Sequence, residues 1–277
     1  MFADLHIHSW YSDGTLSPEE IIEKAIAQNI TLISISDHET IGAYLANNGL
    51  FADEDIKLIT GVEIISIMGD TEYHILAYGF NTQDKALNDL LRHNRDILAE
   101  KGNKLIEQVS IEYENISMNE FLKYERNRKD GGWESIDYLK IKGIVSDVSD
   151  YFKLARKYSI ALDKNFLCAA RAIEIIHNAG GYAVLAHLGN SAKQDLTACE
   201  KVAAQFLDIG IDGFECYYPS HSDEITEFLV KLCREHDLII TAGSDEHGGF
   251  NESFGGVNYY IGAVKVKIEQ LNLKSLL

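Results

Sequence analysis

The stretch FADLHIHSWYSDGTLSPEE, residues 2–20, places two histidines at the end of a short apolar run and a helix start soon after it. Side chains alternate between the two faces of a strand, so His6 and His8 point to one side and the apolar residues beside them point to the other. Ser17 can cap a helix that begins at Pro18, because a glutamate stands three residues after the cap. The stretch therefore predicts a strand, a polar turn and a helix, the first unit of an α/β fold.

Short apolar runs and amphipathic stretches alternate along most of the remaining chain. Six further runs predict strands: ITLISIS (30–36), IKLITGVEII (56–65), EYHILAYGF (72–80), YAVLAHL (182–188), GFECYY (213–218) and LIITAGSD (238–245). Helical stretches at 168–179, 193–208 and 222–236 separate the later runs. Alternation at this spacing favours a parallel sheet, and about seven such units favour a closed or nearly closed α/β barrel.

The segment 82–165 interrupts this alternation with long helical patterns such as DLLRHNRDILAEKGNKLIEQV. We interpret it as a helical insertion subdomain, carried by a barrel domain formed from residues 1–81 and 166–277. Its charge balance also differs: residues 90–164 hold 14 Lys and Arg against 13 Asp and Glu, whereas the rest of the chain holds 11 against 30. An anionic ligand is therefore expected to meet the chain at the insertion.

The overall composition disfavours several classes of protein. A formal net charge of −18 disfavours binding to long nucleic acid, because neutralisation of phosphates supplies most of that affinity. No stretch approaches the roughly 18 consecutive apolar residues of a membrane helix, and the N-terminus lacks the pattern of a secretory leader. We expect a cytoplasmic protein that does not contact a membrane, and nothing in the sequence indicates its oligomeric state.

Titratable residues recur where the predicted strands end. A pair such as His6 and His8 indicates a metal only weakly by itself, because polar residues also pair at strand ends. The recurrence is more specific, since the carboxyl ends of the strands of an α/β barrel meet at one mouth, where unpaired charges would cost several kcal/mol each. Imidazoles and carboxylates without thiolates suit Zn²⁺, Mn²⁺ or Fe²⁺. The other residues at such positions are Asp37, His38, Glu63, His74, His187, Asp245 and His247.

Several motifs follow one another along the chain in a fixed order: H-x-H, Asp13, S-D-H, G-V-E, a strand histidine, A-H and S-D-x-H. With this order the sequence resembles the PHP (polymerase and histidinol phosphatase) family over about residues 1–80 and 168–262. The resemblance implies a distorted (β/α)7 TIM-like barrel of the PHP type that binds two or three divalent metal ions, Mn, Fe or Zn. It also implies three ligand sets, which are His6, His8, Glu63 and Asp245 for one metal, Glu63, His74 and His187 for a second, and Asp13, His38 and His247 for a third.

A helical insertion after the fourth strand is similar to the small bacterial PHP phosphoesterases. The resemblance implies a metal-dependent hydrolase that uses metal-bound hydroxide on small phosphate monoesters, namely nucleotides or short 5′-phosphorylated oligonucleotides. Those relatives usually carry Arg-Pro-His in the insertion and a proline after the A-H histidine. Here the insertion reads GGWESIDYLKIKG, and Leu188 follows His187.

Residues beyond the ligands are candidates for proton transfer and for substrate binding. His221 in YYPSHS is a candidate general acid, with an exposed loop histidine as the alternative. The run YERNRKDGGW offers Arg126, Arg128 and Lys129 for phosphate contacts, with a solvated charged loop as the alternative. Arg171 is a further candidate for substrate binding, from the helix that precedes the A-H histidine.

Two other functions remain open at this point. One is a phosphatase for histidinol phosphate or phosphoserine, which would use the same metal chemistry on a different leaving group. The other is a non-catalytic metal-binding module that regulates a partner, as degenerate PHP domains do in some polymerases. The complete set of ligand residues disfavours the module, since a domain without catalysis has no need of every ligand.

Overall fold

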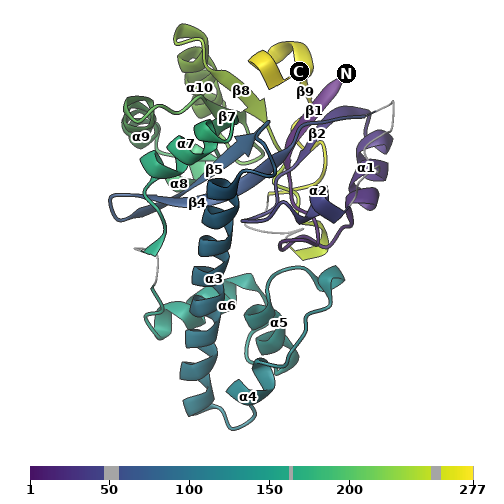
Figure 1. Ribbon diagram of the computed structural model, residues 1–277, viewed down its shortest axis with the longest axis vertical. Helices are drawn as coiled ribbons and strands as arrows, with labels where there is room; N and C mark the ends of the chain where they lie inside the picture. The colour runs from purple at the N-terminus through teal and green to yellow at the C-terminus, as the bar shows by residue number, and fades with distance from the viewer. Residues whose placement is uncertain (47–55, 162–164, 251–256, 277) are drawn as a thin grey trace.

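The computed structural model describes residues 1–46, 56–161, 165–250 and 257–276. In Figure 1 the upper half contains two sheets flanked by helices, and the lower half contains helices alone. The strands are β1 (Phe2–Ile7), β2 (Ile30–Ile35), β3 (Lys57–Leu58), β4 (Gly61–Met68), β5 (Thr71–Tyr78), β6 (Tyr182–Leu185), β7 (Gly213–Tyr217), β8 (Ile239–Ala242) and β9 (Val266–Lys267). The helices are α1 (Pro18–Ala27), α2 (Gly42–Ala46), α3 (Lys85–Glu112), α4 (Met118–Phe121), α5 (Glu134–Ile141), α6 (Val148–Lys157), α7 (Ala169–Asn178), α8 (Leu188–Ser191), α9 (Leu196–Asp208) and α10 (Asp223–Glu235), with short 3-10 turns at Arg128–Asp130, Gly248–Phe250, Ile268–Gln270 and Lys274–Leu276.

The first unit of the chain folds as its sequence predicts. Strand β1 is followed by α1, which begins at Pro18. The Ser17 hydroxyl accepts a hydrogen bond from the Glu20 backbone N–H at 3.2 Å, and the Glu20 carboxylate accepts one from the Ser17 N–H at 2.8 Å. This capping box satisfies two backbone donors that the first helical turn would otherwise leave free. It fixes where the polar turn between β1 and α1 ends.

The strands lie in two sheets, so of the closed or nearly closed barrel expected from the sequence, full closure is not shown in the described residues. One sheet has the order β3-β2-β1-β9 and the other β4-β5-β6-β7-β8. A parallel sheet was also expected throughout, yet β5 is antiparallel to both β4 and β6. The reason is the turn at Gly69 and Asp70, because a two-residue connection can only join antiparallel neighbours.

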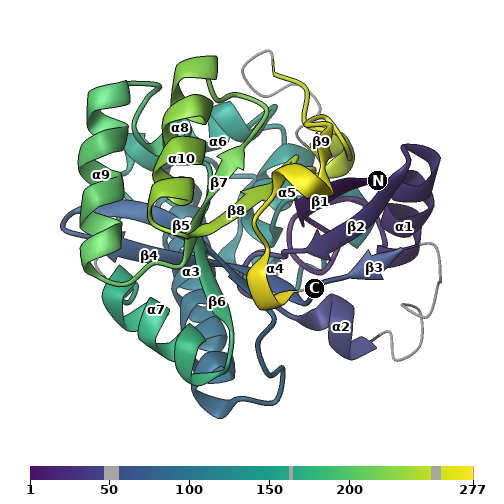
Figure 2. The same cartoon turned by 90° about the horizontal axis from the view of Figure 1, so that it is seen from above.

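Two isolated bridges connect the sheets where the site residues lie. Ile7 at the end of β1 bridges to Glu246 after β8, and His38 after β2 bridges to Glu63 in β4. Both edge strands of the five-stranded sheet, β4 and β8, therefore lie beside the other sheet without a continuous hydrogen-bonded ladder. Figure 2 shows the arrangement from above, with α7, α9 and α10 beside one sheet and α1 beside the other.

Helices α3 to α6 form the lower half of the molecule in Figure 1. The first turns of α3 pack Leu87 and Leu91 into the core of the sheet half, whereas Leu105 and Val109 pack against α5 and its neighbours. One continuous helix thus joins the two halves, and the division into a barrel and an insertion remains our interpretation. No described helix is both long and apolar enough to cross a membrane.

Candidate metal centre

The nine predicted ligands lie together, although they come from six different strands or the loops after them. His6 is the fifth residue of β1, and Glu63 and His74 lie in the antiparallel pair β4 and β5. The others follow the ends of strands: His8 and Asp13 after β1, His38 after β2, His187 after β6, and Asp245 and His247 after β8. Sequence position therefore identified a set of residues that the fold brings together in space.

The carboxylate of Glu63 occupies the middle of this cluster and is fully buried. Its Oε1 lies 2.9 Å from Nδ1 of His74 and 3.0 Å from Nε2 of His187. Its Oε2 lies 3.2 Å from one nitrogen of each of three further rings, those of His6, His8 and His38. One carboxylate is therefore within reach of five imidazoles.

Three overlapping sets have ligand atoms within 4.8 Å of one another. We call them the inner group (His6, His8, Glu63, Asp245), the outer group (His8, Asp13, His38, His247) and the flanking group (His38, Glu63, His74). The inner group matches the first ligand set implied by the family resemblance. The outer group contains the third set and adds His8. The flanking group includes His38 in the place that the resemblance gives to His187.

The contacts within the cluster fit divalent cations. Nε2 of His6 and Nε2 of His8 lie 3.1 Å apart. Each also lies within 3.4 Å of Glu63 Oε2 and of Asp245 Oδ1. Several buried atoms that face other members of the cluster have no hydrogen-bond partner among the described residues: His8 Nδ1, Asp13 Oδ1, His38 Nδ1 and Glu63 Oε2. Buried polar atoms are almost always paired, so unpaired donor atoms that converge are what a metal site provides. Imidazole and carboxylate ligands without thiolates suit divalent transition metals.

Charges within the cluster shift the pKa of its members in opposite directions. Burial alone would lower the pKa of His8, but the nearby carboxylates of Asp245 and Glu63 raise it to about 10. Burial alone would raise the pKa of Glu63, but the surrounding imidazoles hold it well below its usual value. Burial lowers the pKa of His38 to about 4. Protons on some rings therefore balance the carboxylates, and cations would take the place of those protons.

Two of the cluster residues have backbone conformations that side chains rarely adopt. The φ angle is +55° at Asp245 and +30° at His187. Non-glycine residues in this region cost of order 1–3 kcal/mol and cluster at functional sites. Backbone strain at Asp245 and His187 therefore accompanies the orientation of these two side chains toward the cluster.

Glu215 supports the cluster, and the sequence did not reveal it. It lies in β7, is 1% exposed, and its Oε1 is 2.9 Å from Nδ1 of His6. Its Oε2 accepts a hydrogen bond from the backbone N–H of His187 at 2.8 Å. When Nδ1 of His6 carries the proton and donates to Glu215, the lone pair of Nε2 faces the cluster. The available signal was an acidic residue within the otherwise apolar run GFECYY.

Asp37 supports the loop that carries Asp13. Its carboxylate accepts hydrogen bonds from the Ser9 N–H and the Ser9 hydroxyl, both at 2.7 Å, and from the Ser12 hydroxyl at 2.6 Å. These three bonds tie the loop after β1 to the end of β2. Asp37 therefore holds neighbouring ligand loops together, although it belongs to none of the three groups.

His221 does not point a free proton at the cluster. Its Nε2 accepts a hydrogen bond from the Gly189 N–H at 3.0 Å, and its Nδ1 lies 3.2 Å from the Cys216 carbonyl oxygen, to which it can donate. Burial lowers the pKa of His221. Both nitrogens are thus engaged by the backbone in the neutral ring. Its role as the general acid remains a prediction that this geometry does not favour.

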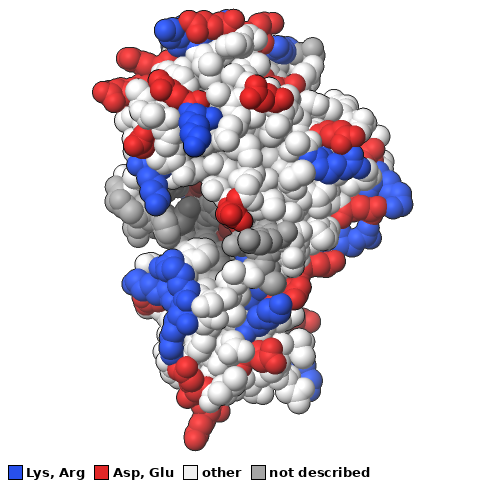
Figure 3. All heavy atoms as spheres, turned by 90° about the vertical axis from the view of Figure 1, so that its left-hand side faces the viewer, with Lys and Arg blue, Asp and Glu red and all other residues white. Residues whose placement is uncertain are grey.

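The three basic candidates of the run 126–129 lie beside the loop that carries Asp13. Arg126 donates from Nη2 to the Ser12 carbonyl oxygen at 2.9 Å. Arg128 lies 5.1 Å above the ring of Tyr11, and Lys129 lies 5.9 Å above the ring of Trp10. Figure 3 shows the opposite side of the molecule, where Lys and Arg side chains are interspersed with Asp and Glu on both halves.

Arg171 has a different environment. It lies on α7 with its side chain 51% exposed, and it pairs with Glu174 one turn further along the same helix, at 2.6 Å. A surface pair of this kind contributes little to stability. Within the described residues, no hydrogen bond or ion pair joins Arg171 to the nine ligands, so its assignment as a substrate contact remains a prediction.

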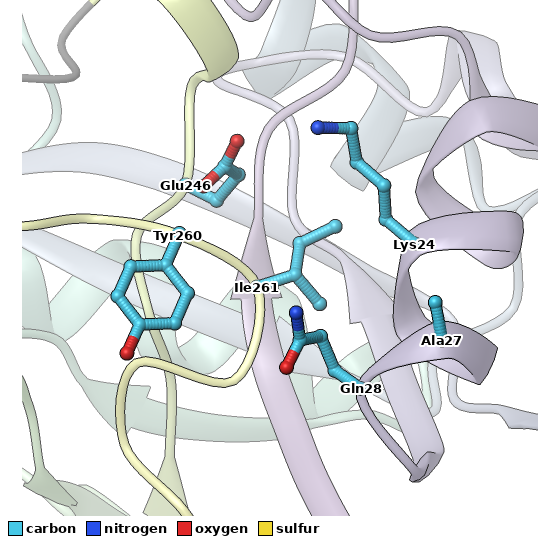
Figure 4. A pocket seen from close by; sticks show the side chains of 6 residues that line it. All are labelled: Lys24, Ala27, Gln28, Glu246, Tyr260 and Ile261. Carbon is cyan, nitrogen blue, oxygen red and sulfur yellow. The ribbon is translucent and has the colours of Figure 1, made fainter.

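A cavity of about 120 Å³ lies between α1 and the chain at 260–261 (Figure 4). Its lining consists of Lys24, Ala27, Gln28, Glu246, Tyr260 and Ile261, which include none of the nine predicted ligands. Glu246 is 5% exposed and accepts a hydrogen bond from the Gly248 N–H at 3.0 Å, and burial raises its pKa to about 7. This cavity is therefore separate from the cluster, although Glu246 stands between two cluster residues in the sequence.

Comparison with known proteins defines the class to which this chain belongs. The PHP domain matches residues 4–217, which is most of the chain, so the chain belongs to the PHP domain family. The resemblance stated from the sequence motifs is confirmed. Members of this family include hydrolases that act on phosphoester bonds, as the relatives described next illustrate.

Individual relatives are bacterial enzymes of phosphate esters. The 5′-3′ exoribonuclease of Haemophilus influenzae is 30% identical, with 88% of this chain and 89% of that protein covered. The 5′-3′ exoribonuclease Rnm of Escherichia coli is 28% identical, with 88% and 84% covered. The 3′,5′-nucleoside bisphosphate phosphatase of Chromobacterium violaceum is 29% identical, with 88% and 86% covered.

Solved structures share the architecture. A protein of Bifidobacterium adolescentis has a TM-score of 0.74 at 24% identity, with 96% of this chain and 97% of that chain covered, which shows the fold alone. A structure from Chromobacterium violaceum, described as an amidohydrolase with bound sulfate and no metal, has a TM-score of 0.71 at 26% identity, with 96% and 94% covered. The mixed α/β fold with two sheets is thus that of PHP-type proteins.

Proposed function

We propose that this protein is a metal-dependent phosphoesterase that hydrolyses phosphate monoesters of nucleotides or of short 5′-phosphorylated oligonucleotides. The observation that carries the proposal is the convergence of eight imidazoles and carboxylates in three groups, with His187 beside them at Glu63 and several buried ligand atoms unpaired, at one edge of the two sheets. Relatives named for exoribonuclease and nucleoside bisphosphate phosphatase activity support the substrate class. The related structure that contains sulfate supports an anion of tetrahedral shape.

The residues of the three groups would hold two or three divalent ions, with Mn, Fe and Zn as the candidates. Such ions, when bound, lower the pKa of a water molecule and neutralise charge on a phosphate group. The inner group offers three nitrogen or oxygen ligands that are almost completely buried, His6, His8 and Glu63. Glu215 orients His6, and Asp37 holds the loop of Asp13. These residues fix the positions at which a phosphate ester would be bound and water would be excluded.

The basic side chains beside the Asp13 loop are the proposed contacts for the rest of the substrate. Arg126 and Arg128 carry guanidinium groups that suit phosphate oxygens, and Trp10 and Tyr11 are aromatic side chains on which a base can stack. This arrangement favours a nucleotide over an amino-acid ester. Histidinol phosphate and phosphoserine have no second phosphate for the guanidinium groups and no nucleobase for the aromatic rings. The proposed substrate therefore extends from the cluster toward the run 126–129.

The experiment measures phosphate release by metal-stripped protein and by protein reconstituted with Mn²⁺. The panel contains nucleoside monophosphates, nucleoside 3′,5′-bisphosphates, 5′-phosphorylated dinucleotides, histidinol phosphate, phosphoserine and an N-acyl amino acid. We expect Mn²⁺-dependent turnover concentrated on the nucleotide substrates, and we expect R126A together with R128A to reduce it without changing the hydrolysis of a simple aryl phosphate.

Other outcomes would identify other functions. Turnover restricted to histidinol phosphate or phosphoserine would replace the proposed substrate class, and turnover of the amide alone would replace the reaction. Tight metal binding with no turnover across the panel would leave the non-catalytic module as the function.

A further inference from the structure

Helix α3 makes a buried contact with residues next to the predicted ligands, although no ligand takes part in it. Asn94, on α3, is fully buried and donates from Nδ2 to Oε1 of Glu39 at 3.0 Å and to the carbonyl oxygen of Ile65 at 2.8 Å. The same Oε1 accepts the backbone N–H of Ile65 at 2.5 Å. Glu39 directly follows His38 in the chain, and Ile65 lies in β4, two residues after Glu63. Asn94 therefore joins the His38 loop to the strand of Glu63.

The neighbouring residue strengthens this contact from the solvent side. The guanidinium of Arg95 donates through Nη1 to the backbone carbonyl of Glu39. Glu39 itself has a φ of +55°, a conformation that costs free energy for a residue with a side chain. Hydrogen bonds to both its side chain and its carbonyl hold this strained turn, and the strained turn sets the direction of the adjacent His38 ring.

The helical half contacts the cluster at a second place, beside Asp13. The backbone N–H of Gly132 donates to the Asp13 carbonyl oxygen at 2.7 Å. Gly131 has a φ of +67°, and a Cβ there would lie 2.9 Å from the same oxygen, so only glycine allows this approach. Arg126 donates to the preceding carbonyl, that of Ser12. The segment that contains α3 to α6 thus holds the chain at two members of the outer group, Asp13 and His38.

The inner group is supported by different elements. His6 is held by Glu215 from β7, and Asp245 accepts a hydrogen bond from the hydroxyl of Tyr218 at 2.7 Å. The backbone N–H of Asp245 donates to the carbonyl of His6 at 2.8 Å. These contacts join β1 to the segments after β7 and β8, within the sheet half.

We propose that the segment 82–165 positions the outer group, with Asn94 and Arg95 as positioning residues for His38, so that the affinity for one cation depends on the helical half. The inference rests on the proposed metal centre. It assigns a function to the segment that is separate from substrate contact, since Asn94 is buried behind the ligand loop. The inner group keeps its cation when the α3 contact is lost.

The test measures Mn²⁺ binding to metal-stripped full-length protein by isothermal titration calorimetry, with metal analysis after equilibrium dialysis. N94L removes both hydrogen bonds of the amide at nearly the same side-chain size. The matched control is N88L, because Asn88 lies on the same helix and its amide also donates to two backbone carbonyls, those of Thr82 and Asp84 at 2.9 and 2.7 Å. R95M keeps the aliphatic stem and removes only the guanidinium contact.

We expect N94L to weaken one class of Mn²⁺ site by about tenfold or more and to leave the other class unchanged, since residues that orient metal ligands typically contribute this much to affinity. R95M should act in the same direction, and N88L should bind as the unmodified protein does. In a H247A background, which lacks a ligand of the outer group, N94L should have no further effect on the inner group, whose ligands do not include His38.

Circular dichroism establishes which variants are folded. If N94L does not fold, R95M and its combination with H247A decide the question. Folded variants with an unchanged isotherm would overturn the inference, as would equal weakening of every site. Because binding is measured without turnover, a protein that behaves as expected here but hydrolyses no ester would refute the proposed function alone.

Discussion

Replacing Glu215 by glutamine tests how the cluster is oriented while adding or removing almost no volume. In the present arrangement both carboxylate oxygens accept hydrogen bonds, one from Nδ1 of His6 at 2.9 Å and one from the His187 N–H at 2.8 Å. A carboxamide has only one acceptor oxygen. If that oxygen stays with His187, the amide NH₂ faces Nδ1 of His6, and the ring must move its proton to Nε2. That proton would then point into the inner group.

The opposite orientation of the amide is also costly. It would keep the tautomer of His6, but it would place two N–H donors against each other at His187, whose backbone already has a φ of +30°. Either way one ligand loses its orientation. Changes to residues that orient metal ligands typically weaken binding 10- to 100-fold, which corresponds to about 1.4–2.7 kcal/mol.

The assay is Mn²⁺ titration of metal-stripped E215Q by calorimetry, with the melting temperature as a check on folding. Asp212 offers a matched control, because its Oδ2 accepts the Ala183 N–H at 2.7 Å and lies 2.7 Å from Nε2 of His177, the same pair of partner types outside the cluster. We expect D212N to bind Mn²⁺ normally. A folded E215Q protein with unchanged Mn²⁺ affinity would refute the reasoning about His6.

Three further predictions concern single elements. S17A removes the capping side chain of α1 and should lower the free energy of unfolding by about 1 kcal/mol in urea titrations, whereas an unchanged midpoint would contradict the role of the capping box. H221N should reduce kcat less than about tenfold, because both ring nitrogens are engaged by the backbone, and a loss of about 100-fold or more would restore His221 as the acid. The metal-free protein should lose thermal stability as the pH rises from 6.5 to about 10, because a histidine whose folded pKa is raised stabilises fully below its unfolded pKa and loses that contribution as it deprotonates. His8 is the group concerned, and a melting temperature that rises across this interval would show that it is not charged in the folded state.

The ligand residues could be found from the sequence because their signal is local. Most of them stand at or near the end of an apolar run, whereas His74 lies within one and Asp13 was assigned through the family motif. Two-residue alternation places His6 and His8 on one face without knowledge of the rest of the fold. The capping box at Ser17 and Glu20 is equally local, since four consecutive residues determine it. These features needed no information on which strands are neighbours.

Features that depend on contacts between distant segments were missed. Glu215 stands out in the sequence only as an acidic residue within an apolar run, and the position of β7 relative to β1 and β6 is what brings it to His6 and His187. The contact of Asn94 with Glu39 joins residues that are far apart in the sequence. A continuous closed barrel is not shown, because single bridges at Ile7 and at His38 stand where hydrogen-bonded ladders between the two sheets would be needed. The antiparallel direction of β5 was missed because strand count alone does not fix strand direction, which the short turn at 69–70 reverses.

The shared carboxylate of Glu63 also determines how the centre fills. Because it belongs to both the inner and the flanking group, a cation bound in one group would fix the carboxylate and the rings that a cation in the other group would also use. The second ion then finds ordered ligands but also the charge of the first. The sum of these opposing contributions is a single coupling free energy, and by thermodynamic reciprocity it has the same value whichever ion enters first. If the proposed centre binds two ions, its loading would therefore be a cooperative equilibrium, whose Hill coefficient would report whether ordering or repulsion is larger at Glu63.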